Sequence, residues 1–467
     1  MLHISDLHMR SIDGPQAARV RLEAASRWRV LGAKWTTNLA DIRRDGTPVD
    51  LVVFTGDLGD WGHPTDYPRA LTFLKETCAA LDVPLDRLFV IPGNHDIDRT
   101  VQRAAWESLR RDVAGDPQAY SRWMAGEDRG ALRGDNRRDQ ILERQQAFWA
   151  AVATELGRPE LAPKHSPHGR LGYRQAVALS GLSQPIHVIG LDTAWFAGGS
   201  GDGGQLRLTE HQVSLLTTTE TGEPLSGFRL ALMHHRLADL ADGGDARRDM
   251  ADRVDLLLHG HQHEPAMDVL QGPDHQLVVL ATGCLYEGDE GHHYPNACQV
   301  IDLMLDEHAR PRGAEVRFRG WSERGMFWGD DALLYENARR GRLRLHRGAR
   351  GWRFAEDGEV QQEHTSAHAP GDEAPSRLRR PPGWIDFTAR RERLLVRFGS
   401  SGAIASWRSW MSGSWGLAMP LGSWSPVAPE WARARSSRRG SRGARSPAPW
   451  CRITSSSAGT SRAIGRR

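Results

Sequence analysis

The chain has 467 residues and a mass of 51.9 kDa, which is enough for two or three domains with a buried core. Hydrophobic residues make up 39% and glycines number 49, a composition that excludes a collagen-like, largely disordered or small disulfide-rich protein. The net charge of +3 is unevenly divided, because residues 398–467 contain eleven Arg and one Glu without Lys or Asp, and residues 1–397 therefore carry −7. The acidic part gives no indication of a nucleic-acid-binding face.

Short apolar runs rich in Val, Ile and Leu predict strands that are buried on both faces of a sheet. They occur at 2–5, 51–54, 88–91, 186–191, 229–233, 254–258 and 277–281. Segments with helical spacing lie between them, at 17–44, 67–81 and 209–217. This alternation predicts an α/β layered fold. The longer segment 99–157 also has apolar residues at helical spacing, and we expect it to be a helical insertion into the core.

After the first 320 residues, which we expect to form the main α/β domain, the apolar pattern weakens. We expect a small appendage at 321–356, a Pro- and Gly-rich linker at 357–383, a short helix at 384–397 and a basic low-complexity tail at 398–467. Three interpretations of the tail stay open: an arm that stacks on single-stranded nucleic acid, plain disorder, and the product of a frameshift.

Polar clusters follow five of the predicted strands, at the edge where open α/β sheets place their active sites. They are Asp6-Leu7-His8, Gly56-Asp57, Gly93-Asn94-His95-Asp96, His234-His235 and Gly260-His261-Gln262-His263. Residues i and i+2 of an extended segment point the same way, so both side chains of D-x-H or H-x-H can reach one point. The donors are oxygen and nitrogen atoms with no thiolate, which suits Mn²⁺, iron or Zn²⁺ in paired sites better than a structural zinc site.

Each motif also has an interpretation that involves no function. A D-x-H after a strand is more often a capped turn, and G-N-H-D is a natural turn because Gly and Asn tolerate left-handed backbone geometry. An H-x-H alone can be a solvated loop. Five such motifs at strand ends, in one order, are far less expected by chance, and together they indicate a metal site.

The order D-x-H, G-D, G-N-H-D, H and G-H-x-H resembles the calcineurin-like metallophosphoesterase superfamily over about residues 1–320. The resemblance implies a four-layer α/β/β/α sandwich with two divalent metal ions. One ion would be held by Asp6, His8 and His263. The other would be held by Asn94, His234 and His261, with Asp57 bridging the two; His234 is favoured over His235 because the family ligand lies at the strand end. The tract 91–99 resembles a bacterial subgroup fused to NTP-hydrolysing or conflict-system modules.

Two cations about 3.5–4 Å apart lower the pKa of a bridging water, so that a hydroxide can attack phosphorus in line. His95 directly follows a candidate ligand and is expected to donate a proton to the leaving oxygen. We expect Asp96 either to orient His95 or only to shape the turn, and Arg99 to contact phosphate. For other nearby polar residues, such as Asp60 and Asp192, a structural or solvated role is expected.

The sequence thus indicates a metal-dependent phosphoesterase, with a diester such as a cyclic nucleotide or a nucleic-acid end as the favoured substrate. A nucleotide-signal sensor or regulatory module of a multidomain bacterial defence or signalling protein is the alternative. No stretch approaches the ~18 consecutive apolar residues of a membrane span, and the N-terminus lacks a secretion signal. We therefore expect a cytoplasmic location and no membrane partner, while protein partners are not indicated.

Overall fold

In the computed structural model the chain groups into a unit of Met1–Ala369 and a second unit, Pro370–Arg467, none of whose residues is described. The structure describes residues 1–11, 17–45, 48–113, 115–126, 132–163, 171–199, 201–271, 276–286, 296–332, 334–335, 341–348 and 351–354. The linker (357–383), short helix (384–397) and basic tail (398–467) expected from the sequence lie outside the described residues.

Eight strands form the first sheet. Their order is β14 (Gly351–Phe354), β13 (Arg342–Gly348), β11 (Pro311–Ser322), β10 (Ala297–Leu305), β1 (Leu2–Ile4), β2 (Val52–Phe54) and β3 (Leu88–Val90), and β12 (Phe327–Asp330) pairs with β11. Strands β1, β2 and β3 run parallel, whereas β1 pairs antiparallel with β10. The carboxyl ends of β1, β2 and β3 therefore meet at one edge of the sheet.

Six strands form the second sheet. Their order is β4 (Tyr173–Val177), β5 (Ile186–Gly190), β6 (Phe228–Leu232), β7 (Leu256–His259), β9 (Gln276–Ala281) and β8 (Ala266–Gln271). Strands β5, β6, β7 and β9 run parallel, and antiparallel strands β4 and β8 form the two edges. The loops after β6 and β7 thus also share one edge.

Helices α1 (Ala17–Leu31), α2 (Ala33–Arg44) and α3 (Tyr67–Ala80) pack against the first sheet. The sequence predicts one helix over 17–44, but the helix divides at Gly32, where a Cβ atom would lie 2.5 Å from the carbonyl oxygen of Trp28. In α2 the buried residues Trp35, Asn38, Leu39 and Ile42 recur at positions i, i+3, i+4 and i+7. This spacing gives α2 one apolar face for packing.

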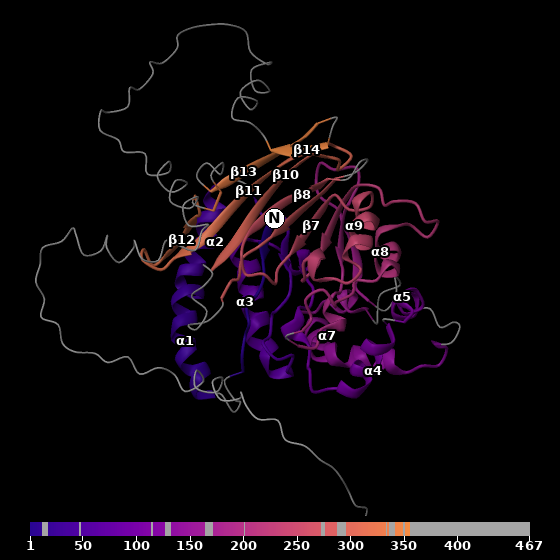
Figure 1. Cartoon of the computed structure of the whole chain (residues 1–467). Helices are drawn as coiled ribbons and strands as arrows, with labels where there is room; N and C mark the ends of the chain where they lie inside the picture. Colours follow the sequence, from indigo (N-terminus) through magenta and orange to yellow (C-terminus); the bar gives the residue numbers. More distant parts are fainter. Residues whose placement is uncertain are drawn as a thin grey trace, which may run out of the picture. The chain divides into compact units, whose positions relative to one another are not determined.

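Helices α8 (Glu210–Thr217) and α9 (Gly243–Ala251) cover the outer face of the second sheet, where Val213 and Met250 belong to the same buried cluster as Ala231. Figure 1 shows α1 and α2 on one side of the strands and α8 and α9 on the other. The segment 99–157, expected as a helical insertion, contains α4 (Arg103–Val113), α5 (Pro117–Ala125), α6 (Arg137–Leu142) and α7 (Gln146–Thr154).

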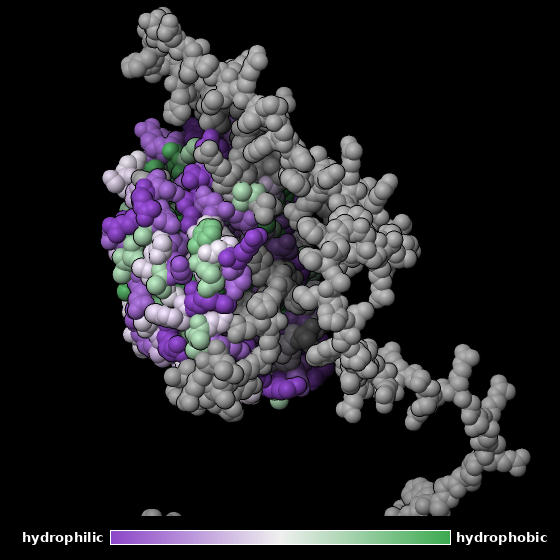
Figure 2. Space-filling model, turned by 90° about the vertical axis from the view of Figure 1, so that its left-hand side faces the viewer, coloured by the Kyte–Doolittle hydropathy of each residue, from purple (hydrophilic) through white to green (hydrophobic). Residues whose placement is uncertain are grey.

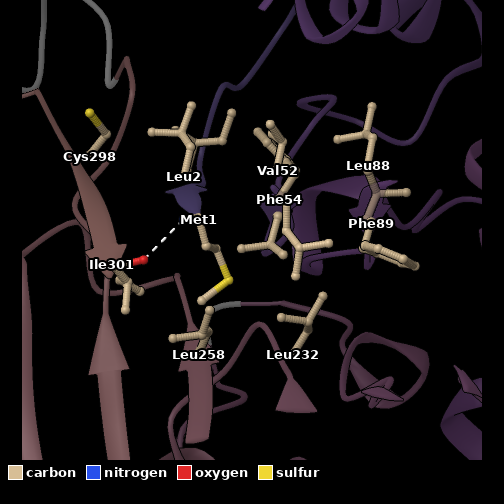
Figure 3. Close-up of a cluster of buried hydrophobic side chains, with 14 of the residues drawn as sticks. Met1, Leu2, Val52, Phe54, Leu88, Phe89, Leu232, Leu258, Cys298 and Ile301 are labelled. Carbon is tan, nitrogen blue, oxygen red and sulfur yellow. Dashed lines mark hydrogen bonds between the residues drawn. The ribbon is translucent and has the colours of Figure 1, made fainter. Parts of the chain in front are cut away.

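The two sheets face each other across a core of aliphatic and aromatic side chains (Figure 3). Leu2 and Phe54 from the first sheet and Leu232 and Leu258 from the second are fully buried in this core. Residue Ala231, next to Leu232 in β6, lies instead in the buried cluster that contains α8 and α9, because successive strand residues point to opposite faces. The predicted α/β/β/α arrangement is confirmed.

From the sequence we expect the main domain to end at residue 320, but this position lies inside β11. The strand pairing does not support a boundary there. Strands β12 and β13 pair with β11, and β14 pairs with β13, so that all three join the first sheet. Strands β12, β13 and β14 therefore extend the sheet and do not form a separate appendage. Each added strand pairs backbone groups that an edge strand would leave open.

One face of the described part of the chain has a largely polar surface. On the face drawn in Figure 2 the coloured residues are mostly hydrophilic, with small hydrophobic areas scattered among them, as is usual for protein surfaces. Among the helices that the structure describes, none combines the length and apolar character needed to cross a membrane.

Candidate metal centre

The polar clusters predicted at five strand ends come together at one place. Asp6 and His8 follow β1, Asp57 follows β2, and Asn94 and His95 lie in a 3₁₀ turn (Asn94–Asp96) after β3. From the second sheet, His234 follows β6, and His261 and His263 follow β7. Both sheets direct these carboxyl ends toward the same edge, so donors separated by more than 200 residues become neighbours.

The first group of donors consists of Asp6, His8 and His263. Nε2 of His263 lies 3.3 Å from Nε2 of His8 and 3.3 Å from Oδ1 of Asp6, and Nε2 of His8 lies 3.8 Å from that same oxygen. Asp6 is fully buried, and no hydrogen-bond donor meets its Oδ1 atom. A buried carboxylate oxygen without a donor is costly, and a cation among these three atoms would satisfy it.

The second group consists of Asp57, Asn94 and His234. Nε2 of His234 lies 3.3 Å from Oδ2 of Asp57 and 3.1 Å from Oδ1 of Asn94. Nδ1 of His234 donates to the carbonyl of Thr55 at 2.7 Å, so Nε2 carries the lone pair in the neutral ring, as a metal ligand requires. The same Oδ2 atom of Asp57 lies 3.9 Å from Nε2 of His8, which places one carboxylate between the two groups.

His261 lies beside the second group, with its ring centre 5.1 Å from that of His234 and 4.6 Å from that of His235. Ring nitrogens of these three histidines lie within 4.8 Å of one another. Nδ1 of His235 forms a 2.8 Å hydrogen bond with the hydroxyl of Thr193. The structure therefore brings His235 close to the cluster, but the contacts with Asp57 and Asn94 belong to His234.

The backbone of the site is held in an uncommon conformation. Ten described non-glycine residues have positive φ, and five are candidate ligands: Asp6 (55°), His8 (47°), Asp57 (58°), His261 (72°) and His263 (57°). Such residues cost about 1–3 kcal/mol each and persist only where the surroundings hold them. Arg27 holds the loop after β1 in this conformation. Its guanidinium donates to the carbonyls of Leu7 at 2.6 Å and His8 at 3.0 Å.

Charges of opposite sign are buried together. Burial acts to raise the pKa of the Asp57 carboxyl, but neighbouring His234 and His95 hold it well below its ordinary value. Burial conversely acts to lower the pKa of His234, but Asp57, Asp6 and the carbonyl of Thr55 together raise it to about 9. The buried carboxylates thus need positive charge beside them, which either protons on the histidines or metal ions can supply. The donor set fits divalent metal ions.

His95 contacts Asp60, a residue to which the sequence assigned no catalytic part. Nδ1 of His95 donates to the carbonyl oxygen of Asp60 at 3.0 Å and to its Oδ1 atom at 3.1 Å. Burial acts to lower the pKa of His95, but Asp57 and Asp60 together raise it to about 9. The sequence signal that could have identified this residue is the spacing G-D-x-x-D, since Asp60 follows Asp57 by three positions.

The contacts of Asp96 favour the second expectation, in which it shapes the turn and does not orient His95. Its carboxylate accepts hydrogen bonds from the backbone N–H groups of Leu58 at 3.1 Å, Gly59 at 2.7 Å and Gly93 at 2.9 Å. Burial and the charge of Asp57 raise its pKa to about 7. Asp96 therefore ties the loop after β3 to the loop after β2.

Arg99 is exposed at the margin of the site, where its guanidinium donates to the carbonyl of Asn94 at 3.3 Å. The structure also brings a thiol close to these donors, although the sequence predicts only oxygen and nitrogen donors. Cys284, which follows β9, has its Sγ atom within 4.8 Å of ring nitrogens of His8 and His263. Nothing in the local sequence signals this, because 276 residues separate Cys284 from His8.

Residues 1–183 match the model of the calcineurin-like phosphoesterase family, which confirms the resemblance for that part of the chain; the bacterial subgroup stays a prediction. No curated protein matches the chain. Similar solved structures include the sulfate thiohydrolase SoxB of Thermus thermophilus in complex with glycerol, at 13% identity and a TM-score of 0.33, over 68% of this chain and 55% of that one.

Wild-type Vps29 of Entamoeba histolytica complexed with Zn²⁺ is similar at 12% identity and a TM-score of 0.24, over 71% of this chain and 96% of that one. A hypothetical protein from Thermus thermophilus is similar at 15% identity and a TM-score of 0.32, over 70% and 94% of the two chains. This chain thus spans about half the length of SoxB and nearly the full length of the other two.

Proposed function

Because residues 1–183 match the calcineurin-like phosphoesterase family, we propose that the protein is a metal-dependent hydrolase of phosphate esters with a dinuclear centre. The observation that carries this proposal is the position of Asp57, whose Oδ2 atom lies 3.9 Å from Nε2 of His8 and 3.3 Å from Nε2 of His234. One carboxylate thus faces nitrogen donors of both groups, as a bridging ligand must.

In this proposal Asp6, His8 and His263 hold one ion, and Asn94, His234 and His261 hold the other. Mn²⁺, iron and Zn²⁺ suit such oxygen and nitrogen donors. When bound, two such ions activate water for attack on phosphorus and neutralise charge on the phosphoryl oxygens.

His95 is proposed to donate a proton to the leaving oxygen. Its Nδ1 atom is committed to Asp60, so Nε2 is the atom that meets the substrate. Its ring centre lies 4.7 Å from that of His8, and about a third of its side chain is exposed. A donor beside the metal ligands, yet open to an incoming ester, has the placement that general acid catalysis requires.

We propose a diester as substrate, either a cyclic nucleotide or a nucleic-acid end, with Arg99 as a contact of its phosphate group. A guanidinium carries five N–H donors, so Arg99 can contact a phosphate oxygen while one donor stays on Asn94. A cytoplasmic location is proposed because the three cysteines in the described part of the chain, all buried, form no disulfide with one another, as is usual in reducing compartments.

The test is hydrolysis of bis-p-nitrophenyl phosphate and p-nitrophenyl phosphate by the full chain with Mn²⁺. His95→Ala should reduce turnover by about 10²–10⁴-fold, and Asp57→Asn should abolish it together with binding of the second ion. His308→Ala and Asp82→Asn are matched controls, because both side chains are exposed outside the metal centre, and both should retain activity.

Diester turnover that is lost in both site variants and kept in both controls would support the proposal. Stoichiometric binding of a nucleotide by the metal-loaded chain, without turnover of either ester, would favour the sensor module instead. Hydrolysis that survives Asp57→Asn would contradict a dinuclear mechanism.

A further inference from the structure

The turn after β9 is fastened to the loop that carries Asp6. Sγ of Cys284 donates to the carbonyl oxygen of Asp6 at 3.1 Å. The N–H of Leu285 donates to the carbonyl of Ser5 at 3.0 Å, and the N–H of Tyr286 donates to the carbonyl of Asp6 at 3.2 Å. Three hydrogen bonds within three residues therefore hold the Cys284 side chain beside the first group of candidate ligands.

The spacing of that first group matches one small ion. Ligand atoms about 2.0–2.3 Å from a tetrahedral Zn²⁺ ion lie about 3.3–3.8 Å from one another. The three distances among Oδ1 of Asp6, Nε2 of His8 and Nε2 of His263 are 3.3, 3.3 and 3.8 Å. Independently, Oδ1 of Asp6 is buried without a hydrogen-bond partner, and a cation bound among these three atoms would satisfy it.

We propose that Cys284 is a further protein ligand of this first site, beside Asp6, His8, His263 and the bridging Asp57, and that the site then takes a thiophilic divalent ion of the Zn²⁺ type. The inference rests on the metal centre of the proposed function, but not on the hydrolysis of any ester. Sγ of Cys284 lies within 4.8 Å of the ring nitrogens of His8 and His263, a separation that a small movement of one side chain closes. Carboxylates, imidazoles and a thiolate are all ligand types that Zn²⁺ accepts.

The proton balance of this step is simple. When Cys284 binds the ion, its thiol proton passes to solvent and the sulfur lone pair forms the new bond. The carbonyl of Asp6 loses the Sγ–H donor, but it keeps the N–H of Tyr286, so no buried acceptor is left unpaired. The second site, around Asp57, Asn94 and His234, has only oxygen and nitrogen donors, and the two sites therefore differ in metal preference.

The test uses the full-length chain stripped of metal with a chelator and reloaded with Co²⁺. Coordination by a thiolate produces sulfur-to-cobalt charge-transfer absorption in the near ultraviolet, which oxygen and nitrogen ligands do not. Wild type should show this band, Cys284→Ser should lack it, and Cys298→Ser should keep it. Cys298 is a matched control because it is also a buried cysteine, lies in β10 and belongs to none of the described groups that could hold a metal ion.

A second measurement distinguishes loss of the metal ligand from failure of a variant to fold. Competition between Zn²⁺ and Mn²⁺ should show Zn²⁺ binding at least about tenfold weaker in Cys284→Ser than in Cys298→Ser, with circular dichroism confirming that both variants are folded. Absence of the band in wild type, or its persistence in Cys284→Ser, would overturn the inference. A band without ester hydrolysis would support the thiolate ligand while contradicting the proposed function, so the two failures are distinguishable.

Discussion

Asp60 connects two histidines of the site at the scale of single residues. Its Oδ1 atom lies 3.1 Å from Nδ1 of His95 and 3.4 Å from Nδ1 of His8, and its Oδ2 atom accepts from Nε of Arg10 at 2.7 Å. Arg10 in turn pairs with Glu23 at 2.9 Å. A chain of charged groups thus fixes the tautomer and orientation of both rings.

Asp60→Asn should lower kcat for diester hydrolysis by at least about tenfold with little change in KM, because the amide keeps the geometry but removes the charge that stabilises protonated His95. That charge raises the pKa of His95, and a proton donor loses activity as the pH rises through its pKa. The alkaline limb of the kcat profile should therefore move to lower pH in the variant.

The matched control for this measurement is Asp82→Asn, which removes a carboxylate from an exposed position outside the site. A purely structural role for Asp60 would lower thermal stability and leave the position of the alkaline limb unchanged, contrary to this prediction.

At the scale of elements, three glycines allow the strand-end loops to meet. A Cβ atom on Gly93 would lie 2.2 Å from Oδ1 of Asp57, and one on Gly56 would lie 2.4 Å from Nδ1 of His234. A Cβ atom on Gly260 would lie 2.0 Å from the hydroxyl oxygen of Ser5. Glycine at these positions is therefore required by close approach between loops from different strands, not only by local turn geometry.

Gly93→Ala should displace the loop after β3 from Asp57 and weaken binding of the second metal ion, measured by calorimetric titration of the metal-free chain with Mn²⁺. Gly203→Ala is the matched control, because nothing lies within 4 Å of the added Cβ atom, and its titration should equal that of wild type. Equal titrations for both variants would show that the loop tolerates the displacement.

At the scale of the whole molecule, the site joins two sheets. Asp6, His8, Asp57 and Asn94 come from loops of the first sheet, whereas His234, His261 and His263 come from loops of the second. Bound ions would therefore link the two layers at their carboxyl edge. Ligands that bind only the folded state stabilise it by about 2.7 kcal/mol at a concentration 100 times Kd.

Removal of metal with a chelator should accordingly lower the melting temperature of the wild-type chain, and adding back Mn²⁺ or Zn²⁺ should restore it. The Asp57→Asn variant should show a smaller change, because it no longer binds the second ion. Identical melting curves with and without chelator, for a chain shown by elemental measurement to hold metal beforehand, would argue against a site that links the sheets.

The sequence predicts the buried parallel strands well and several other strands poorly. The runs at 2–5, 51–54 and 88–91 become β1, β2 and β3, since a strand buried on both faces is continuously apolar. Strand β11 is not continuously apolar, because it contains Arg317 and Arg319. Both arginines are buried and bond to Asp330 of β12, a pairing that no local pattern reveals.

By itself, then, the sequence determined the α/β class and the candidate ligands at the strand ends, because burial and strand termination leave local signals that can be read along the chain. Only the tertiary structure decided that Asp60 and not Asp96 contacts His95, that β12, β13 and β14 extend the first sheet, and that Cys284 lies beside His8 and His263. These outcomes depend on contacts between distant segments, which follow from how the sheets pack and not from the spacing of residues.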